Sequence, residues 1–177
     1  MKYLSFFAGL LAVCALLVSS YASAEGEGSS PQSAHAFVQG FYDWYVQQSQ
    51  QDNNLSGVEL ALKDRPEAFS EEIVRALRED LAASAKSPDE VVGLDFDPFL
   101  NAQEVCAPYK VGKTAKQGNT YRVEVYGSCP DAGSHKPDVI AEMRARDGRW
   151  MFVNFIYPGN GDLLTVLKSL KEERQKN

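Results

Sequence analysis

The dipeptide Asp147-Gly148 is the feature that most restricts how this chain can fold. A two-residue Asp-Gly connection between alternating apolar and polar residues is typical of a β-hairpin with a type I′ turn. The turn pairs Arg146 with Arg149 and Met143 with Phe152. One face of the hairpin then carries a row of mostly apolar residues, which predicts a core-facing surface containing one amide. The members of this row are Val139, Ala141, Met143, Ala145, Trp150, Phe152, Asn154 and Ile156.

A preceding hairpin is expected with its turn centred on Gln117-Gly118. This turn pairs Lys116 with Asn119, and the same register places Cys106 opposite Cys129 unless a bulge intervenes. Residues 1–24, which contain Cys14, have the features of a secretory signal that is removed on export, so Cys106 and Cys129 are the two cysteines left. An even pair in an exported chain is most simply a disulfide. Metal binding is the alternative, but no further Cys or His lies at ligand spacing from either residue. We therefore predict a Cys106–Cys129 disulfide.

Helical periodicity marks three further segments. The first runs from Ser33 into the polar residues 50–54, the second from an N-cap at Ser70 to Ser87-Pro88, and the third begins at Asp162. The order is therefore helix, helix, four strands, helix. It predicts an α+β fold in which the helices pack on a curved four-stranded antiparallel sheet and form a cone.

Residues 1–24 have the features of a cleaved secretory signal: Lys2, an apolar run, and an A-x-A site before Glu25. The apolar run is shorter than the roughly 20 residues that span a bilayer. Cys14 raises the alternative of a lipid anchor, but more apolar sequence follows it. We expect an exported, unanchored chain with a disordered lead-in at residues 25–32 and a single domain at residues 33–177.

The balance of charge limits the classes of partner. Acidic residues number 24 against 18 basic ones, and the basic residues form no long cluster. An acidic surface of this kind argues against nucleic acid and anionic membranes as partners. A protein or a small ligand of the cell envelope is the expected partner.

Six residues are candidates for a binding surface or pocket. Tyr42, Asp43, Trp44 and Tyr45 cover more than one face of the first helix, so part of this cluster is expected to be exposed. The alternative is that the rings only cover the sheet. Asn154 is expected to need several hydrogen-bond partners and to line a pocket with Tyr157, unless backbone groups satisfy it.

Candidates for catalysis and metal binding are few. The chain has only His35 and His135 and none of the common catalytic motifs, so no catalytic residue and no cofactor are assigned. Asp95 and Asp97 could supply oxygen ligands to a hard cation, although their spacing is not that of an EF-hand loop. Aspartates that accept backbone hydrogen bonds in successive turns before Pro98 are the alternative.

The stretches GLDFDPFLNAQE, DGRWMFVNFIYP and DLLTVLKSL, with the paired tyrosine-rich strands, resemble a family of small bacterial envelope proteins of unknown function. The resemblance covers about residues 33–170. It implies a periplasmic location and a cystatin-like, cone-shaped α+β fold of the nuclear-transport-factor-two-like type. It implies no catalytic residue. Lipid-anchored members have a cysteine at the cleavage site, which this chain lacks.

The expected function is therefore that of a periplasmic binding or accessory module. One version is the inhibition of an envelope-acting toxin, because a small acidic exported protein would attract a basic partner. The alternative is an enzyme that acts on a small substrate inside the cone, with Asp43, Asn154 or Tyr157 as polar groups. The missing catalytic constellation favours binding over catalysis.

Overall fold

The structure is a computed structural model, and it describes residues 30–51, 55–87, 92–129 and 136–176. The predicted signal sequence and residues 25–29 of the predicted lead-in lie outside these residues. Pro31 and Gln32 of that lead-in instead form the start of the first helix, because Ser30 is its N-cap and makes a capping box with Ser33. The helix therefore starts two residues earlier than its apolar periodicity indicates.

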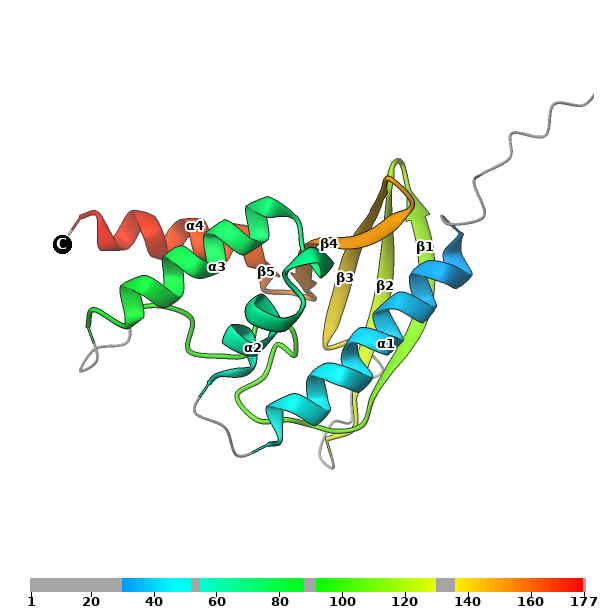
Figure 1. Ribbon diagram of the computed structural model, residues 1–177, viewed down its shortest axis with the longest axis horizontal. Coiled ribbons are helices and arrows are strands. Elements are labelled where there is room, and N and C mark those ends of the chain that lie inside the picture. Colours follow the sequence, from blue (N-terminus) through cyan, green and yellow to red (C-terminus); the bar gives the residue numbers. More distant parts are fainter. Residues whose placement is uncertain (1–29, 52–54, 88–91, 130–135, 177) are drawn as a thin grey trace, which may run out of the picture.

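Four α-helices, a short 3-10 helix and one antiparallel sheet make up the described chain (Figure 1). The sheet has five strands in sequential order instead of the predicted four, because the two-residue β5 pairs with the end of β4. The elements are α1 (Pro31–Ser49), α2 (Gly57–Asp64), η1 (Pro66–Ala68), α3 (Glu71–Ser84), β1 (Tyr109–Gln117), β2 (Thr120–Gly127), β3 (Val139–Arg146), β4 (Arg149–Tyr157), β5 (Gly161–Asp162) and α4 (Leu163–Arg174).

Helix α2 is an element that the predicted order omits. Ser56 and Glu59 form a reciprocal capping box at its start, and its three consecutive residues 60–62 are buried. The Ser-x-x-Glu spacing is visible in the sequence, but eight residues are too few for a convincing helical period. Helix α3 begins at its predicted N-cap, where the Ser70 side chain accepts a hydrogen bond from the Ile73 N–H.

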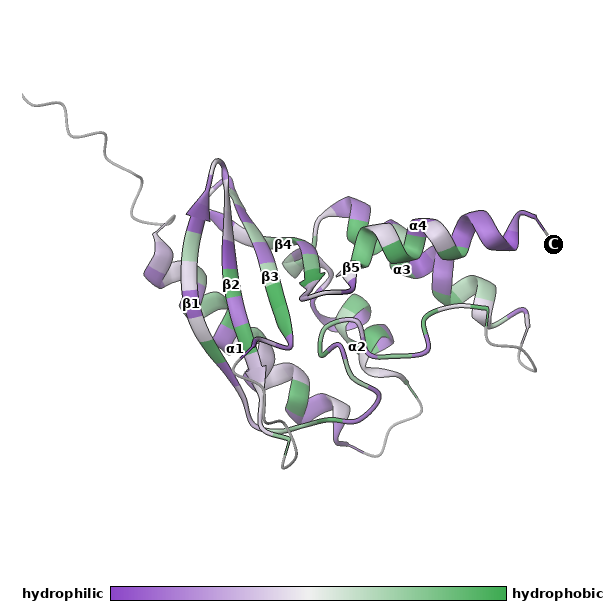
Figure 2. Ribbon diagram, turned by 180° about the vertical axis from the view of Figure 1, so that it is seen from behind, coloured by the Kyte–Doolittle hydropathy of each residue, from purple (hydrophilic) through white to green (hydrophobic). Residues whose placement is uncertain are grey.

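Helix α1 lies across one face of the sheet, and α3 and α4 run side by side beyond its β4 edge (Figure 1). Seen from behind in Figure 2, the opposite face of β1 to β3 shows hydrophilic and hydrophobic residues alternating along the strands. The core lies between α1 and the sheet and is filled by aromatic rings with centroid separations of 4.8–6.4 Å. These rings are Phe41, Phe69, Phe99, Phe152 and Phe155.

The second hairpin has the predicted turn and the predicted pairs Arg146–Arg149 and Met143–Phe152. Both turn residues have positive φ, 51° at Asp147 and 73° at Gly148, as a type I′ turn requires. A β-bulge then follows at residue 153, so Glu142 pairs with Asn154. Beyond the bulge the side chains alternate in the opposite sense. Phe155 and Tyr157 are buried in the core, whereas Asn154 and Ile156 are not, which corrects the predicted core face.

The first hairpin turns one residue later than predicted. Gln117 pairs with Thr120, so Gly118 and Asn119 form the turn, and Gly118 takes a φ of 59° that costs glycine little. A register shift between residues 111 and 114 also changes which residues of β1 and β2 pair, relative to the predicted alignment. The predicted disulfide between Cys106 and Cys129 is present, just beyond the ends of β1 and β2.

Candidate binding grooves on either side of helix α3

The aromatic cluster of helix α1 does not form one exposed surface. Tyr42 and Tyr45 are buried, at 1% and 0% relative exposure, Trp44 is half-buried, and Asp43 is exposed. The Arg65 guanidinium covers the Trp44 ring at 4.2 Å from its centroid. The two tyrosines therefore belong to the core, whereas Asp43 and part of Trp44 remain accessible.

Three buried tyrosines instead hold the loop that was a candidate for metal binding. Tyr42 donates to the Phe99 carbonyl at 2.7 Å, and Tyr157 donates to the Pro98 carbonyl at 3.0 Å. Tyr45 donates to the Asp97 carboxylate at 2.6 Å. Burial raises the pKa of all three hydroxyls, so they remain donors at neutral pH.

Asp97 has the structural role that was the alternative to metal binding. Its Oδ1 accepts hydrogen bonds from the backbone N–H groups of Phe99 and Leu100, and its Oδ2 accepts from Tyr45. Burial raises the pKa of this carboxyl group, against the effect of these hydrogen bonds. Asp95 is exposed. Within the described residues, no three His, Cys, Asp or Glu side chains are arranged to hold a metal ion.

Asn154 supports the start of helix α4, through partners of the kind expected as the alternative to a pocket with Tyr157. Its side-chain oxygen accepts from the N–H groups of Phe155 (2.9 Å) and Leu164 (3.3 Å), and its amide donates to Asp162 at 2.8 Å. Asp162 in turn caps the helix through the Thr165 N–H. Burial raises the pKa of Asp162, but these hydrogen bonds outweigh it and the net shift is downward. Asn154 therefore has the backbone partners that the alternative reading required.

Replacing Asn154 with alanine is expected to lower the free energy of unfolding by about 1–2 kcal/mol, because the Leu164 and Phe155 N–H groups lose their acceptor. Denaturation in urea at neutral pH measures this loss.

The pH dependence gives a second measurement of the same role. The Asp162 carboxylate stabilises the fold fully above its unfolded-state pKa, and this stabilisation is lost as the pH falls through the lower folded-state pKa. The variant should therefore lose less stability than wild type on acidification. An unchanged unfolding midpoint at neutral pH would contradict this role.

An open groove of about 1320 Å³ lies between helix α3 and the β3–β4 hairpin. Segments far apart in sequence form its two walls: η1 and α3 on one side, and the hairpin strands with their turn on the other. Apolar side chains on the walls include Val74, Met151 and Val153, each of them half-buried. A groove of this size exceeds the roughly 300–1,000 Å³ of most small-molecule pockets. It is better suited to part of a macromolecule.

Charged residues of both signs line this groove. Five of the chain's eight arginines are among its lining residues, and all five are exposed: Arg75, Arg78, Arg144, Arg146 and Arg149. The acidic lining residues are Glu67, Glu71, Glu72, Glu79 and Asp147. The groove is therefore locally neutral in a chain whose formal net charge is −6.

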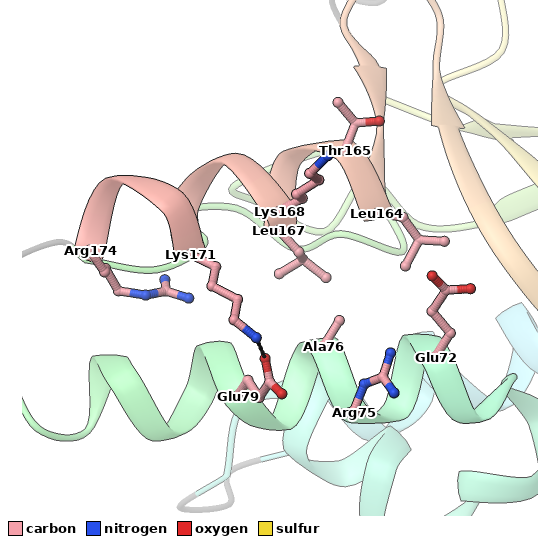
Figure 3. Close-up of a pocket in the computed structure, with 10 residues that line it drawn as sticks. All are labelled: Glu72, Arg75, Ala76, Glu79, Leu164, Thr165, Leu167, Lys168, Lys171 and Arg174. Atoms are coloured by element: carbon pink, nitrogen blue, oxygen red, sulfur yellow. Dashed lines mark hydrogen bonds and ion pairs between the residues drawn. The ribbon is translucent and has the colours of Figure 1, made fainter. Parts of the chain in front are cut away.

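A second, smaller cleft of about 320 Å³ lies on the other side of α3, against α4 (Figure 3). Lys171 and Glu79 meet across it at 2.7 Å. Glu72, Arg75 and Glu79 line both the cleft and the larger groove, so they form an exposed ridge between the two hollows. Helix α3 thus presents a charged ridge with a recess on each side.

None of the residues that sequence reasoning proposed for binding lines either recess. The sequence does contain a signal for the larger groove, in the arginines of RARDGR around the type I′ turn. Alternation places Arg144 and Arg146 on the face opposite the core, and the turn adds Arg149 to the same face. The second wall is supplied by α3, whose position depends on tertiary contacts and is not visible in the sequence.

Comparisons with known proteins give one similar structure to report. No protein-family model matches the chain, and no curated protein matches it. A solved chain of the type VI native effector-immunity complex Tae3-Tai3 from Ralstonia pickettii is similar at 22% identity and a TM-score of 0.49. The match covers 68% of this chain and 90% of that chain. Similarity at this level carries no argument about function.

None of the helices in the described ranges combines the length and apolar character needed to cross a bilayer.

Proposed function

We propose that this protein is a protein-binding module of the periplasm, and that its partner docks in the groove between α3 and the β3–β4 hairpin. The observation that carries the proposal is the groove itself, which is open, about 1320 Å³ in volume and lined by exposed arginines beside half-buried apolar side chains. Arginine and methionine are enriched in protein–protein interfaces. The groove replaces the aromatic helix surface as the expected contact.

Export is the part of the proposal that rests on the sequence. The signal-like residues 1–24 support it, and so does the Cys106–Cys129 disulfide, since disulfides persist in oxidising compartments. We also propose that the protein has the cystatin-like, cone-shaped fold that its resemblance to small envelope proteins implies. The helix α1 that lies across one face of the antiparallel sheet supports that part.

Inhibition of an envelope-acting toxin is the more specific version that we propose. A small module with a rigid aromatic core and a preformed groove would bind with little loss of conformational entropy, as a tight inhibitor needs. The Ralstonia pickettii structure joins an effector to an immunity protein. Its TM-score is too low for it to support this version.

The alternative of an enzyme with a site inside the cone has less support. The rings of Phe41, Phe99 and Phe152 occupy the space between α1 and the sheet. The polar groups that such a site would use are engaged elsewhere, since Tyr157 donates to a backbone carbonyl and Asn154 accepts a hydrogen bond from the Leu164 N–H at the start of α4. Of the proposed groups, Asp43 alone is exposed.

Capture of a partner from an envelope extract tests the proposed function. The bait is the purified mature chain, and the test variant Arg78→Ala/Met151→Ala removes one side chain from each wall of the groove. We expect wild type to retain a partner that the variant loses, with an affinity at least about tenfold weaker, because truncated contacts at the centre of an interface cost most. Tyr42→Ala would not test binding, because that residue is buried.

The matched control is Gln47→Ala/Lys113→Ala, two exposed residues on α1 and β1 that do not line the groove. It should retain the partner as wild type does. Circular dichroism and thermal melts establish that each variant is folded. Equal retention by wild type and the groove variant, or a wild type that retains nothing, would refute the docking site.

A further inference from the structure

We infer that the partner segment in this groove is an acidic, partly apolar stretch of protein whose carboxylates pair with the hairpin arginines. The inference rests on the proposed function and specifies the chemistry of its partner. It also reverses the expectation from net charge, because a chain with an excess of acidic residues was expected to attract a basic partner.

The register of the hairpin gathers three arginines on one face. Arg146 pairs directly with Arg149, and Arg144 pairs with Met151. Met143 and Trp150 alternate with these residues and are buried, so the three arginines and Met151 lie on the opposite face. The tight turn at residues 147–148 holds the arginines within two residues of each other along the strands.

This arrangement carries a cost within the folded chain. Like charges directly opposite one another on two strands are destabilising. Asp147 offsets the cost only in part, because its contact with Arg146 is 3.7 Å and both side chains are highly exposed, at 87% and 71%. An anion supplied by a partner would relieve the repulsion, and that relief would add to the affinity.

The neighbouring acidic residue on the same face is already engaged. Glu142 pairs with Arg122 at 3.3 Å and also accepts from the Thr120 hydroxyl. Among the described residues, no hydrogen bond or ion pair engages the side chains of Arg144 and Arg149. These two guanidinium groups are therefore available for paired hydrogen bonds to a carboxylate.

Helix α3, in the wall that faces the hairpin, adds two further arginines to the groove. They are Arg78 and the ridge residue Arg75, and neither makes a hydrogen bond or ion pair among the described residues, although Arg75 interacts electrostatically with Glu79. The α3 residue Glu79 is held by Lys171 on the other side of the ridge (Figure 3). Its contact with that lysine lowers the pKa of Glu79 and keeps the carboxylate charged but paired.

The same wall makes a continuous polyanion a poor occupant. Glu67, Glu71 and Glu72 also line the groove, and they would repel closely spaced phosphates. Half-buried Met151 and Val153 would bury apolar side chains instead. A protein segment that alternates carboxylates with apolar residues fits both the arginines and the apolar side chains of the groove, whereas nucleic acid fits only the arginines.

Fluorescence anisotropy with defined probes tests this inference. The first probe is a labelled nine-residue peptide that alternates Glu with Val and Leu, the second has Gln in place of Glu, and the third is a nine-nucleotide single strand. We expect the Glu peptide to bind at least about tenfold more tightly than the Gln peptide, and more weakly as salt increases. Equal binding of the two peptides, or tighter binding of the oligonucleotide, would overturn the inference.

The protein variants are Arg144→Gln/Arg149→Gln and the matched control Lys110→Gln/Lys113→Gln, which removes the same charge from exposed positions of β1. The arginine variant should lose the preference for Glu, and the control should keep it. Capture from the envelope extract separates the two proposals. If Arg144→Gln/Arg149→Gln retains a partner that Arg78→Ala/Met151→Ala loses, the acidic segment is refuted and the proposed function stands.

Discussion

Replacing Phe69 with alanine is expected to lower the free energy of unfolding by about 3–5 kcal/mol. The side chain is 4% exposed and lies among the rings of Phe41, Phe99 and Phe152, at centroid separations of 5.1–5.6 Å. Truncation removes these contacts and leaves a cavity that the neighbouring rings cannot fill, because protein cores are close-packed. Chemical denaturation of the two proteins measures the difference.

The same substitution is expected to weaken binding in the groove. Phe69 is one of the groove's lining residues. Its backbone forms an isolated parallel β-bridge with Phe152, and the N–H of the next residue, Ser70, donates to the Phe152 carbonyl at 2.8 Å. These contacts hold the start of α3 against β4, so their loss should change the separation of the two walls. Phe69→Leu keeps most of the buried volume and should lose less stability. Equal stability of wild type and Phe69→Ala would contradict the packing described here.

Replacing Asp80 with alanine is expected to lower the free energy of unfolding by about 3–5 kcal/mol, because it leaves the partly buried Arg174 without its counter-charge. Asp80 accepts a hydrogen bond from Arg174 at 2.7 Å and another from the Leu94 N–H at 2.9 Å. The Asp80 side chain is 5% exposed and the Arg174 side chain is 20% exposed. Arg174 also donates to the Val92 carbonyl. This cluster joins α3, the loop at residues 92–94 and the end of α4, so its loss should detach the C-terminal helix.

A matched control lies on the same two helices. Glu79 and Lys171 are also joined at 2.7 Å, but their side chains are about half exposed. Water and salt screen an exposed pair, so Glu79→Ala should have a much smaller effect on unfolding than Asp80→Ala. A double-mutant cycle of Asp80→Ala with Arg174→Ala measures the coupling directly. Equal losses at the exposed and the buried pair would show that burial does not decide the outcome.

Local signals in the sequence were sufficient for several elements. The Asp147-Gly148 turn set the register of the second hairpin, because a type I′ turn admits few residues and defines its flanking pairs. The cap at Ser70 located the start of α3, and the two cysteines that follow the predicted signal located the disulfide. These features depend on neighbours within a few residues or on a simple count.

Two strand irregularities show where such reasoning fails. The bulge at residue 153 reverses the facing of Asn154 and Phe155, and the turn at Gly118 shifts the first hairpin by one residue. A bulge leaves the composition of a strand unchanged, so alternation alone cannot place it. The aromatic residues at positions 150, 152, 155 and 157 do mark the shift in hindsight, because all four are buried.

The candidate site depended on tertiary structure to a greater degree. Sequence reasoning chose Tyr42 and Tyr45 because a helix with rings on more than one face needs an exposed side, but the loop at residues 97–99 accepts hydrogen bonds from both hydroxyls and covers them. The groove arises only where α3 packs beside the hairpin. The sequence by itself determined the hairpin and its arginines, because adjacent residues specify a turn. Tertiary packing decided which surfaces remained open, because burial depends on contacts between residues far apart in the chain.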